Sequence, residues 1–198
     1  DQDVHELLPP ASQEHLNTLR GRVQRMERLL DDLLAYSRAG RVQHKPQQVD
    51  TGVLVRSIFE LQSPPPEFQL SVEDPLPILY TQRVPLETVL RNLIGNAIKH
   101  HTRPNGQVWV GAQLRAGDVE FHVCDDGPGI APEYHERIFE LFQTLQPRDQ
   151  LEASGMGLAI VKKTVESAGG HVAVRSAEGE GTCFTFTWPI EGSEGTDG

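Results

Sequence analysis

The stretch that decides the fold reads NLIGNAIKH (residues 92–100) and lies in a strong helix expected after Pro85. Asn92, Asn96 and Lys99 are spaced i, i+4 and i+7, so they form one polar stripe along this helix. An Asn carbonyl can bind Mg²⁺ and a Lys ammonium can reach a phosphate, so the stripe fits an oxyanion held with a hard cation. Exposed helices carry the same residue types routinely, so the stripe alone leaves an ordinary solvated face open. The apolar face of the helix consists of Leu86, Val89, Leu90, Leu93, Ile94, Ala97 and Ile98.

Two glycine-bearing segments follow. In CDDGPGI (residues 124–130), Asp125 comes at the end of an alternating strand and can accept a hydrogen bond from an exocyclic amine. Gly127 and Gly129 allow a tight turn and a close approach of the backbone to a ligand. In isolation this spacing also fits a plain turn or a calcium loop.

The segment SGMGLAI (residues 154–160) leads directly into another helix, expected from about Met156 to Ala168. Free backbone amides at a helix N-terminus form an anion site, which the helix dipole reinforces. A third segment, GEGTCF (residues 179–184), is consistent with a hairpin turn when taken alone.

The pattern around these segments predicts the fold class. Residues 41–50 are interpreted as a connector, and a short helix is expected behind Asp50 or Thr51. Strands are expected at residues 68–72 and 78–80, and hairpins pair 108–114 with 119–123 and 172–176 with 183–188. Helices alternating with antiparallel hairpins predict an α+β fold: a two-layer α/β sandwich with a mixed, largely antiparallel sheet, and not a doubly wound parallel sheet.

A long coiled-coil-like helix is predicted before this domain, beginning near Ser12 and Glu14 and closed by Gly40 and Pro46. Its apolar residues step by 3 and 4 and form a seam: Leu16, Leu19, Val23, Met26, Leu30 and Leu33. The seam predicts a homodimer through residues 14–36. An ordinary amphipathic helix packed on its own domain is the alternative.

Composition limits the functional classes. The chain has 198 residues, with 18 Lys and Arg against 28 Asp and Glu, and the net charge of −10 argues against binding nucleic acid or an anionic membrane. Cys124 and Cys183 lie outside any C-x-x-C spacing, so neither a disulfide scaffold nor a thiolate metal site is expected. With no signal peptide and no long apolar run, a reducing, cytoplasmic setting without direct membrane contact is predicted. The chain opens without Met, so a fragment of a longer protein is expected.

Taken in order, NLIGNAIKH, DDGPGI, IFELF, GMGLAI and GEGTCF resemble the N, G1, F, G2 and G3 boxes of the ATP-binding domain of sensor histidine kinases of two-component systems. The resemblance covers residues 49–190 and implies the Bergerat (GHKL) fold, which binds ATP or ADP with Mg²⁺ beneath a mobile lid. The expected organisation is a partial dimerisation helix and connector at 1–45, an ATP-binding catalytic domain at 46–190 and a disordered tail at 191–198.

The resemblance also implies roles for single residues. Asn96 would be the Mg²⁺ ligand, Asn92 and Lys99 would be the catalytic residues beside the phosphates, and Asp125 and Thr182 would bind adenine. The remaining residues of the implied nucleotide site are His100, Gly127, Gly129, Ile130, Gly155, Met156, Gly157 and Leu158.

The lid is expected over residues 143–154, which have few apolar side chains. Arg148 is a candidate contact of the γ-phosphate when the lid closes. Phe139 and Phe142 are predicted to be core residues that anchor the lid.

The segment RMERLLDDLLAYSR (residues 25–38) resembles the end of the second helix of the dimerisation and phosphoacceptor hairpin in the same family. Too little chain separates His5, in HELLPP, from that segment for two antiparallel helices, so the acceptor His is expected upstream. His15 and His44 are assigned to solvated surfaces. The implied activity is transfer of the γ-phosphoryl of ATP to a His, for relay to the receiver domain of a response regulator.

Two rival functions stay open: a hydrolysing GHKL-type ATPase, and a degenerate kinase that serves as a dimeric scaffold. Hydrolysing relatives carry a Glu one turn before the Mg²⁺-binding Asn. Asn92 occupies that position and is a poor general base, so negligible ATP hydrolysis is expected.

Overall fold

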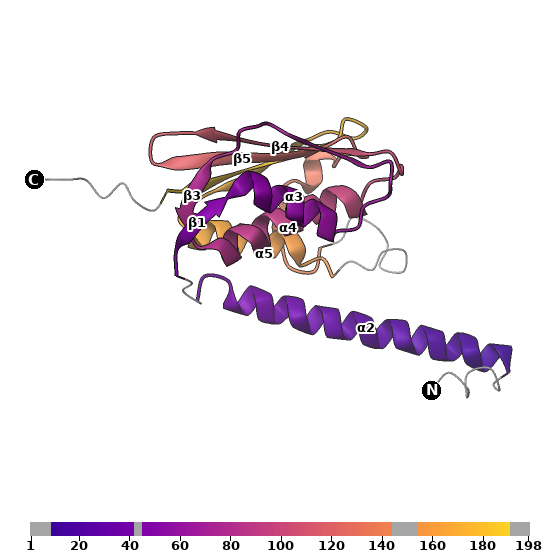
Figure 1. Cartoon of the computed structure of the whole chain (residues 1–198). Coiled ribbons are helices and arrows are strands. Elements are labelled where there is room, and N and C mark those ends of the chain that lie inside the picture. Colours follow the sequence, from indigo (N-terminus) through magenta and orange to yellow (C-terminus); the bar gives the residue numbers. More distant parts are fainter. Residues whose placement is uncertain (1–8, 42–44, 144–153, 191–198) are drawn as a thin grey trace, which may run out of the picture.

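The computed structural model describes residues 9–41, 45–143 and 154–190. One layer is a five-stranded sheet, and α3, α4 and α5 form a second layer on one of its faces (Figure 1). The elements in chain order are α2 (Pro10–Arg38), β1 (Gln47–Asp50), α3 (Thr51–Leu61), β2 (Gln69–Val72), β3 (Ile78–Thr81), α4 (Arg83–Lys99), β4 (Gln107–Leu114), β5 (Asp118–Asp125), the 3-10 turns η1 (Pro132–Tyr134) and η2 (Arg137–Phe139), α5 (Gly157–Ser167), β6 (Val172–Ser176) and β7 (Thr182–Pro189).

The strand order of the large sheet is β2-β4-β5-β7-β6. Strand β2 runs parallel to β4, and the other neighbours are antiparallel. The predicted α+β class and the mixed, largely antiparallel sheet are therefore confirmed.

The core lies between the sheet and the helical layer. Alternate residues of β5 and β7 point inward, and Phe121 stacks on Phe186 with ring centroids 5.1 Å apart. The apolar face of α4 covers them, with Leu90, Leu93 and Ile94 fully buried. Burying a side chain of this kind contributes roughly 1.5–3 kcal/mol, so this interface holds α4, and with it the polar stripe, against the sheet.

A second, two-stranded sheet joins β1 to β3, with Val49 opposite Leu79. The interpretation of residues 41–50 as a connector was therefore wrong for its last four residues. A four-residue strand with one buried side chain, Val49, shows too little alternation to be recognised. The helix that follows begins as predicted, because the Asp50 carboxylate accepts a hydrogen bond from the Val53 amide at 2.9 Å.

Helix α2 lies beyond the helical layer, on the side away from the large sheet (Figure 1). It begins at Pro10 and not near Ser12, because proline fits the first helical turn, where its missing N–H costs no hydrogen bond. The seam side chains are exposed in the single chain, between 40% for Leu16 and 63% for Met26. The helix contacts α5, where the Lys163 Nζ donates a hydrogen bond to the Tyr36 carbonyl at 2.7 Å and lies 4.0 Å from the Tyr36 ring centroid.

Cys124 and Cys183 form a disulfide, which corrects the prediction made from their spacing. The two residues are 59 positions apart in sequence but stand directly opposite each other in the pairing of β5 with β7. In the part of the chain that the structure describes, no helix has both the length and the apolar character needed to span a bilayer.

Candidate functional site

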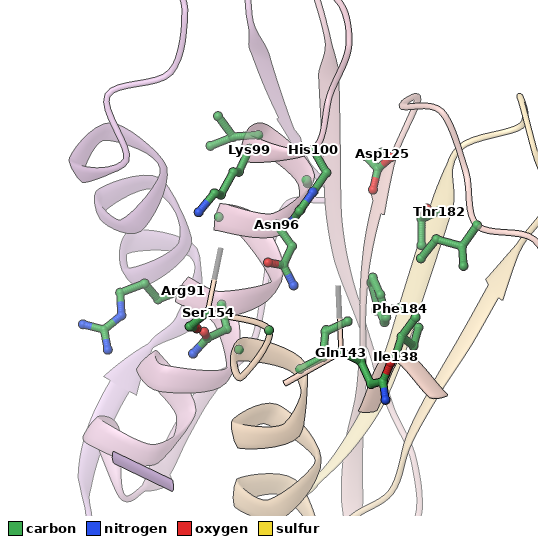
Figure 2. A pocket seen from close by; sticks show the side chains of 18 of the residues that line it. Arg91, Asn96, Lys99, His100, Asp125, Ile138, Gln143, Ser154, Thr182 and Phe184 are labelled. Carbon is green, nitrogen blue, oxygen red and sulfur yellow. The ribbon is translucent and has the colours of Figure 1, made fainter. Parts of the chain in front are cut away.

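A cavity of about 710 Å³ opens between α4, the loop after β5, the first turn of α5 and the start of β7. Figure 2 shows Asn96, Lys99 and His100 along one side and Asp125 and Thr182 across from them. The structure brings eleven of the expected residues to the cavity wall: Asn92, Asn96, Lys99, His100, Asp125, Gly129, Ile130, Gly155, Gly157, Leu158 and Thr182. Segments far apart in sequence thus converge on one space.

Two expected residues do not reach the wall. Met156, the N-cap residue of α5, is fully buried. The backbone N–H of Gly127 donates a hydrogen bond to the Asp125 Oδ1 at 2.9 Å, so Gly127 holds the Asp125 carboxylate and does not line the cavity.

The polar stripe of α4 faces the start of α5. The Asn92 Nδ2 donates to the Thr88 carbonyl at 2.8 Å, which turns the amide oxygen the other way. The Asn92 and Asn96 Oδ1 atoms lie 2.9 and 3.9 Å from the point where a Cβ on Gly157 would stand. Within the described residues, no side chain caps the first turn of α5, and the first amides of a helix have no partner within the helix itself. Side-chain amide oxygens beside the N–H groups of a helix start can hold a cation together with the anion that it neutralises.

Asp125 is the last residue of β5 and pairs with Thr182, the first residue of β7. Burial raises the pKa of Asp125 above its usual value, although hydrogen bonds from the Gly127 and Thr182 amides act in the opposite direction. The carboxylate is thus a partly buried acceptor, which suits recognition of an N–H donor of a ligand.

His100 lies next to the stripe, at the end of α4. Burial and the neighbouring Lys99 charge both lower the pKa of His100. The imidazole is therefore neutral near pH 7 and can donate one hydrogen bond and accept another.

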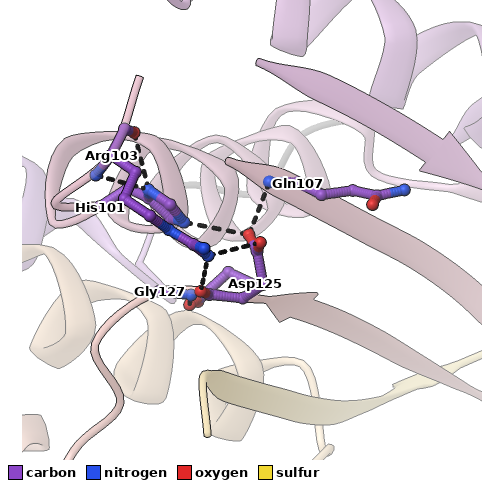
Figure 3. A network of polar contacts seen from close by, with 6 residues as sticks. His101, Arg103, Gln107, Asp125 and Gly127 are labelled. Carbon is purple, nitrogen blue, oxygen red and sulfur yellow. Dashed lines mark hydrogen bonds and ion pairs between the residues drawn. The ribbon is translucent and has the colours of Figure 1, made fainter. Parts of the chain in front are cut away.

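A polar network beside Asp125 was not predicted (Figure 3). The His101 ring is buried, and its Nε2 lies 3.0 Å from the Asp126 Oδ1. The Gln107 amide donates to the same oxygen at 2.7 Å, and the Arg103 Nη2 lies 2.8 Å from the Asp126 Oδ2. Burial acts to raise the pKa of Asp126, but the hydrogen bonds from Gln107 and His101 and the nearby charges outweigh it and lower that pKa. The network ties the segment after α4 to the end of β5. The sequence analysis assigned His100 and Asp125 to the site, and both line the cavity, but it gave no sign that their neighbours His101 and Asp126 contact each other.

The cavity also has walls that the sequence did not indicate. Asp32 of α2, Gln62 and Arg91 line it, as do Ile138 and Phe184. Asp32 lies on α2, which contacts α5, and this contact brings it to the cavity.

The predicted lid is described only at its ends, where Gln143 and Ser154 line the cavity. Phe139 packs on Phe184 with centroids 6.2 Å apart, as a core residue should. Phe142 was predicted to be a core residue but is 46% exposed, and its backbone has a φ of 64°. His15 is exposed, as expected. Outside the described residues lie the expectations for His5, His44, Arg148, the lid interior and the tail at 191–198.

Comparison with known proteins identifies a family. Residues 81–192 match the family described as histidine kinase-, DNA gyrase B-, and HSP90-like ATPase. The chain is 37% identical to cyanobacterial phytochrome A of Nostoc sp., over 87% of this chain and 23% of that protein. It is 34% identical to the adaptive-response sensory kinase SasA of Parasynechococcus marenigrum, over 89% of this chain and 48% of that protein.

Among solved structures, full-length ShkA in complex with AMPPNP is 30% identical, with a TM-score of 0.74, and the match covers 92% of this chain and 40% of that one. The chain spans between 19% and 25% of the length of the first three curated relatives it matches.

Proposed function

The chain belongs to the family of histidine kinase-, DNA gyrase B- and HSP90-like ATPases and carries a GHKL ATP-binding domain; from this premise we propose that it is the catalytic part of a sensor histidine kinase. It binds Mg²⁺-ATP and transfers the γ-phosphoryl to a His on a dimerisation hairpin, for relay to an Asp of a response-regulator receiver domain. Residues 46–190 form the ATP-binding domain, and residues 1–45 contribute part of that hairpin and a connector. This part of the protein works in the cytoplasm, where ATP is available.

One observation carries the proposal: Asn92, Asn96, Asp125, Gly157 and Thr182, which come from four separate segments, line the same cavity. Asp125 and Thr182 bind the adenine at one end. Asn92, Asn96 and Lys99 face the phosphates at the other end, together with the first amides of α5. The nucleotide thus lies along the stripe of α4.

The donor set fits Mg²⁺. This ion prefers oxygen ligands and keeps several waters and phosphate oxygens in its shell, so it needs few protein ligands. The Asn96 amide oxygen, which lies close to the first turn of α5, supplies one. Bound there, Mg²⁺ would neutralise charge that develops on the phosphate oxygens.

Phosphoryl transfer depends mainly on positioning and charge stabilisation. The amides of α5 hold the phosphates, Lys99 adds a positive charge, and the acceptor imidazole is itself the nucleophile. Asn92 cannot act as a general base for water, which favours transfer to His over hydrolysis.

The exposed apolar seam of α2 supports a homodimer through residues 14–36, since a strip of this kind is normally covered. Light scattering of the purified chain should give twice the monomer mass. A monomer at high concentration would contradict this part of the proposal.

The test is calorimetric titration of the chain with ATP and Mg²⁺. Asp125→Asn replaces one acceptor oxygen with a donor and should weaken binding at least about tenfold, the value of one hydrogen bond to a charged group. Asp118→Asn, the same substitution at the opposite end of β5, is the control and should bind as the wild type does. Absence of binding by the wild type would leave only the scaffold function.

Transfer is then measured by mixing the chain and γ-labelled ATP with a separately supplied hairpin that carries the acceptor His. Label on the hairpin supports the kinase. Steady phosphate release without the hairpin, lost in Asn92→Ala, would support the ATPase instead.

A further inference from the structure

The end of the cavity that holds Asp125 is built from two chain segments, and one serine hydroxyl contacts both of them. The loop after β5 (residues 126–130) packs on the turn between β6 and β7 (residues 177–181), where the Gly179 amide donates to the Pro128 carbonyl at 2.7 Å. Between them lies Ser176, the last residue of β6, which pairs with Thr182 across the hairpin.

The Ser176 Oγ has contacts on both sides of this junction. It accepts a hydrogen bond from the Ile130 amide at 2.8 Å and donates one to the Gly181 carbonyl at 2.6 Å. The Thr182 Oγ1 lies 3.2 Å away. Ile130 and Thr182 line the cavity, whereas Ser176 does not.

Donor and acceptor counting fixes the direction of the last contact. A serine hydroxyl has one proton and two acceptor sites. A carbonyl oxygen can only accept, so the Ser176 proton is committed to Gly181. The Thr182 hydroxyl must therefore donate its own proton to Ser176, which leaves only its lone pairs for a ligand in the cavity.

We propose that Ser176 is a positioning residue that makes the Thr182 hydroxyl an acceptor and so selects the base of the nucleotide. An acceptor at this place favours an exocyclic amine, as in adenine, and disfavours the exocyclic oxygen that guanine carries at the same ring position. The inference rests on the proposed function, because it takes the Asp125 end of the cavity as the base site. Asp125, which lies beside Thr182 on the same side of the cavity in Figure 2, is a second acceptor, so Ser176 accounts for part of the selectivity.

The experiment measures the dissociation constants of ATP and GTP, each with Mg²⁺, for the full chain and its variants. In Ser176→Ala, the Thr182 hydroxyl is free to rotate and donate, so the preference for ATP over GTP should fall about fivefold, the value of one neutral hydrogen bond. Ser176→Thr retains the hydroxyl and should retain the preference.

The matched control is Thr187→Ala. The Thr187 hydroxyl accepts a hydrogen bond from the His171 amide at 2.9 Å, at the opposite end of the same hairpin and away from the cavity. Thr187→Ala removes a comparable hydrogen bond. The variant should therefore have a lower melting temperature but the same ratio of the ATP and GTP dissociation constants as the wild type.

A purely structural role for Ser176 would weaken ATP and GTP binding by the same factor, and that result would overturn the proposal. Should Ser176→Ala not fold, Ser176→Cys tests the same point, because a thiol keeps the shape and the donor but accepts hydrogen bonds poorly. The preference of Ser176→Cys for ATP over GTP should also fall, and an unchanged preference would refute the inference. A wild-type chain that binds neither nucleotide would instead refute the proposed function on which the inference depends.

Discussion

Gly129 should be the least replaceable residue of the loop after β5. Its φ of +73° lies in the left-handed region, which costs an alanine roughly 1–2 kcal/mol. In addition, a Cβ at this position would overlap the carbonyl oxygen of Ala177, part of the backbone of the turn that precedes β7. Forcing an extra carbon into a packed contact costs roughly 1–3 kcal/mol, so Gly129→Ala should lower the free energy of unfolding by about 2–5 kcal/mol.

Gly179 provides a matched control in the opposing turn. Its φ is +80°, but a Cβ there would meet nothing within 4 Å, so Gly179→Ala should carry only the backbone cost of roughly 1–2 kcal/mol. Urea unfolding, followed by the fluorescence of the buried Trp188, measures both variants under the same conditions.

The difference in the free energy of unfolding between the two variants measures the cost of the overlap between the Cβ and the Ala177 carbonyl oxygen. We expect a difference of about 1–3 kcal/mol. Displacing the turn also moves Thr182, so Gly129→Ala should weaken ATP binding whereas Gly179→Ala should not. Equal losses of stability in the two variants would refute the reasoning from the close packing of the loop against the turn.

Three further predictions follow from single contacts. Reducing the Cys124–Cys183 disulfide opens a loop of 59 residues and should lower the free energy of unfolding by about 4 kcal/mol. Urea unfolding with and without dithiothreitol measures this loss. Labelling of free thiols in the unreduced protein would contradict the presence of the disulfide. Burial raises the pKa of Asp125, so the folded chain binds the proton of this carboxyl group more tightly than the unfolded chain does. The contribution of Asp125 to the free energy of unfolding therefore falls as the pH rises through the raised pKa. Asp125→Asn should therefore gain stability relative to the wild type at pH 7, with the gain shrinking towards pH 4, and a gain independent of pH would exclude this cause. Lys163→Met should release α2 from α5 and speed amide exchange around Tyr36, whereas Lys162→Met, on the exposed side of α5, should not; equal exchange rates would show that this contact does not hold the helix.

The sequence predicted the elements whose signal is local. Helix α3 was expected because Asp50 is a good cap and the apolar residues behind it repeat at helical spacing, and both features lie within a few residues. The stripe of Asn92, Asn96 and Lys99 was visible for the same reason. What the stripe faces depends on residues in other segments, such as Asp125 and Gly157, and only the order of the glycine-bearing segments indicated it.

Features that depend on strand register could not be predicted. The disulfide joins Cys124 and Cys183 because β5 and β7 pair directly opposite each other there, and no spacing rule contains that information. In the sequence, Ser176 is one more polar residue at the end of a strand. Its contacts form only because the β6–β7 hairpin packs against the loop that contains Ile130. Val49 lies in β1, and its partner strand β3 comes only after helix α3 and strand β2 in the chain.

Helix α2 also has a mechanical consequence. Among the described residues, its contacts with the ATP-binding domain lie towards its C-terminal end, around Tyr36, and at a rise of 1.5 Å per residue Pro10 lies about 39 Å further along the axis. A swing of about 10° around the attached end displaces the other by about 7 Å. The helix is thus a lever arm with its pivot beside the cavity wall, where Asp32 lies. A small rotation of α2 beside the cavity therefore produces a large displacement at its N-terminal end. Conversely, a force applied at the N-terminal end exerts a torque on the helix beside the cavity.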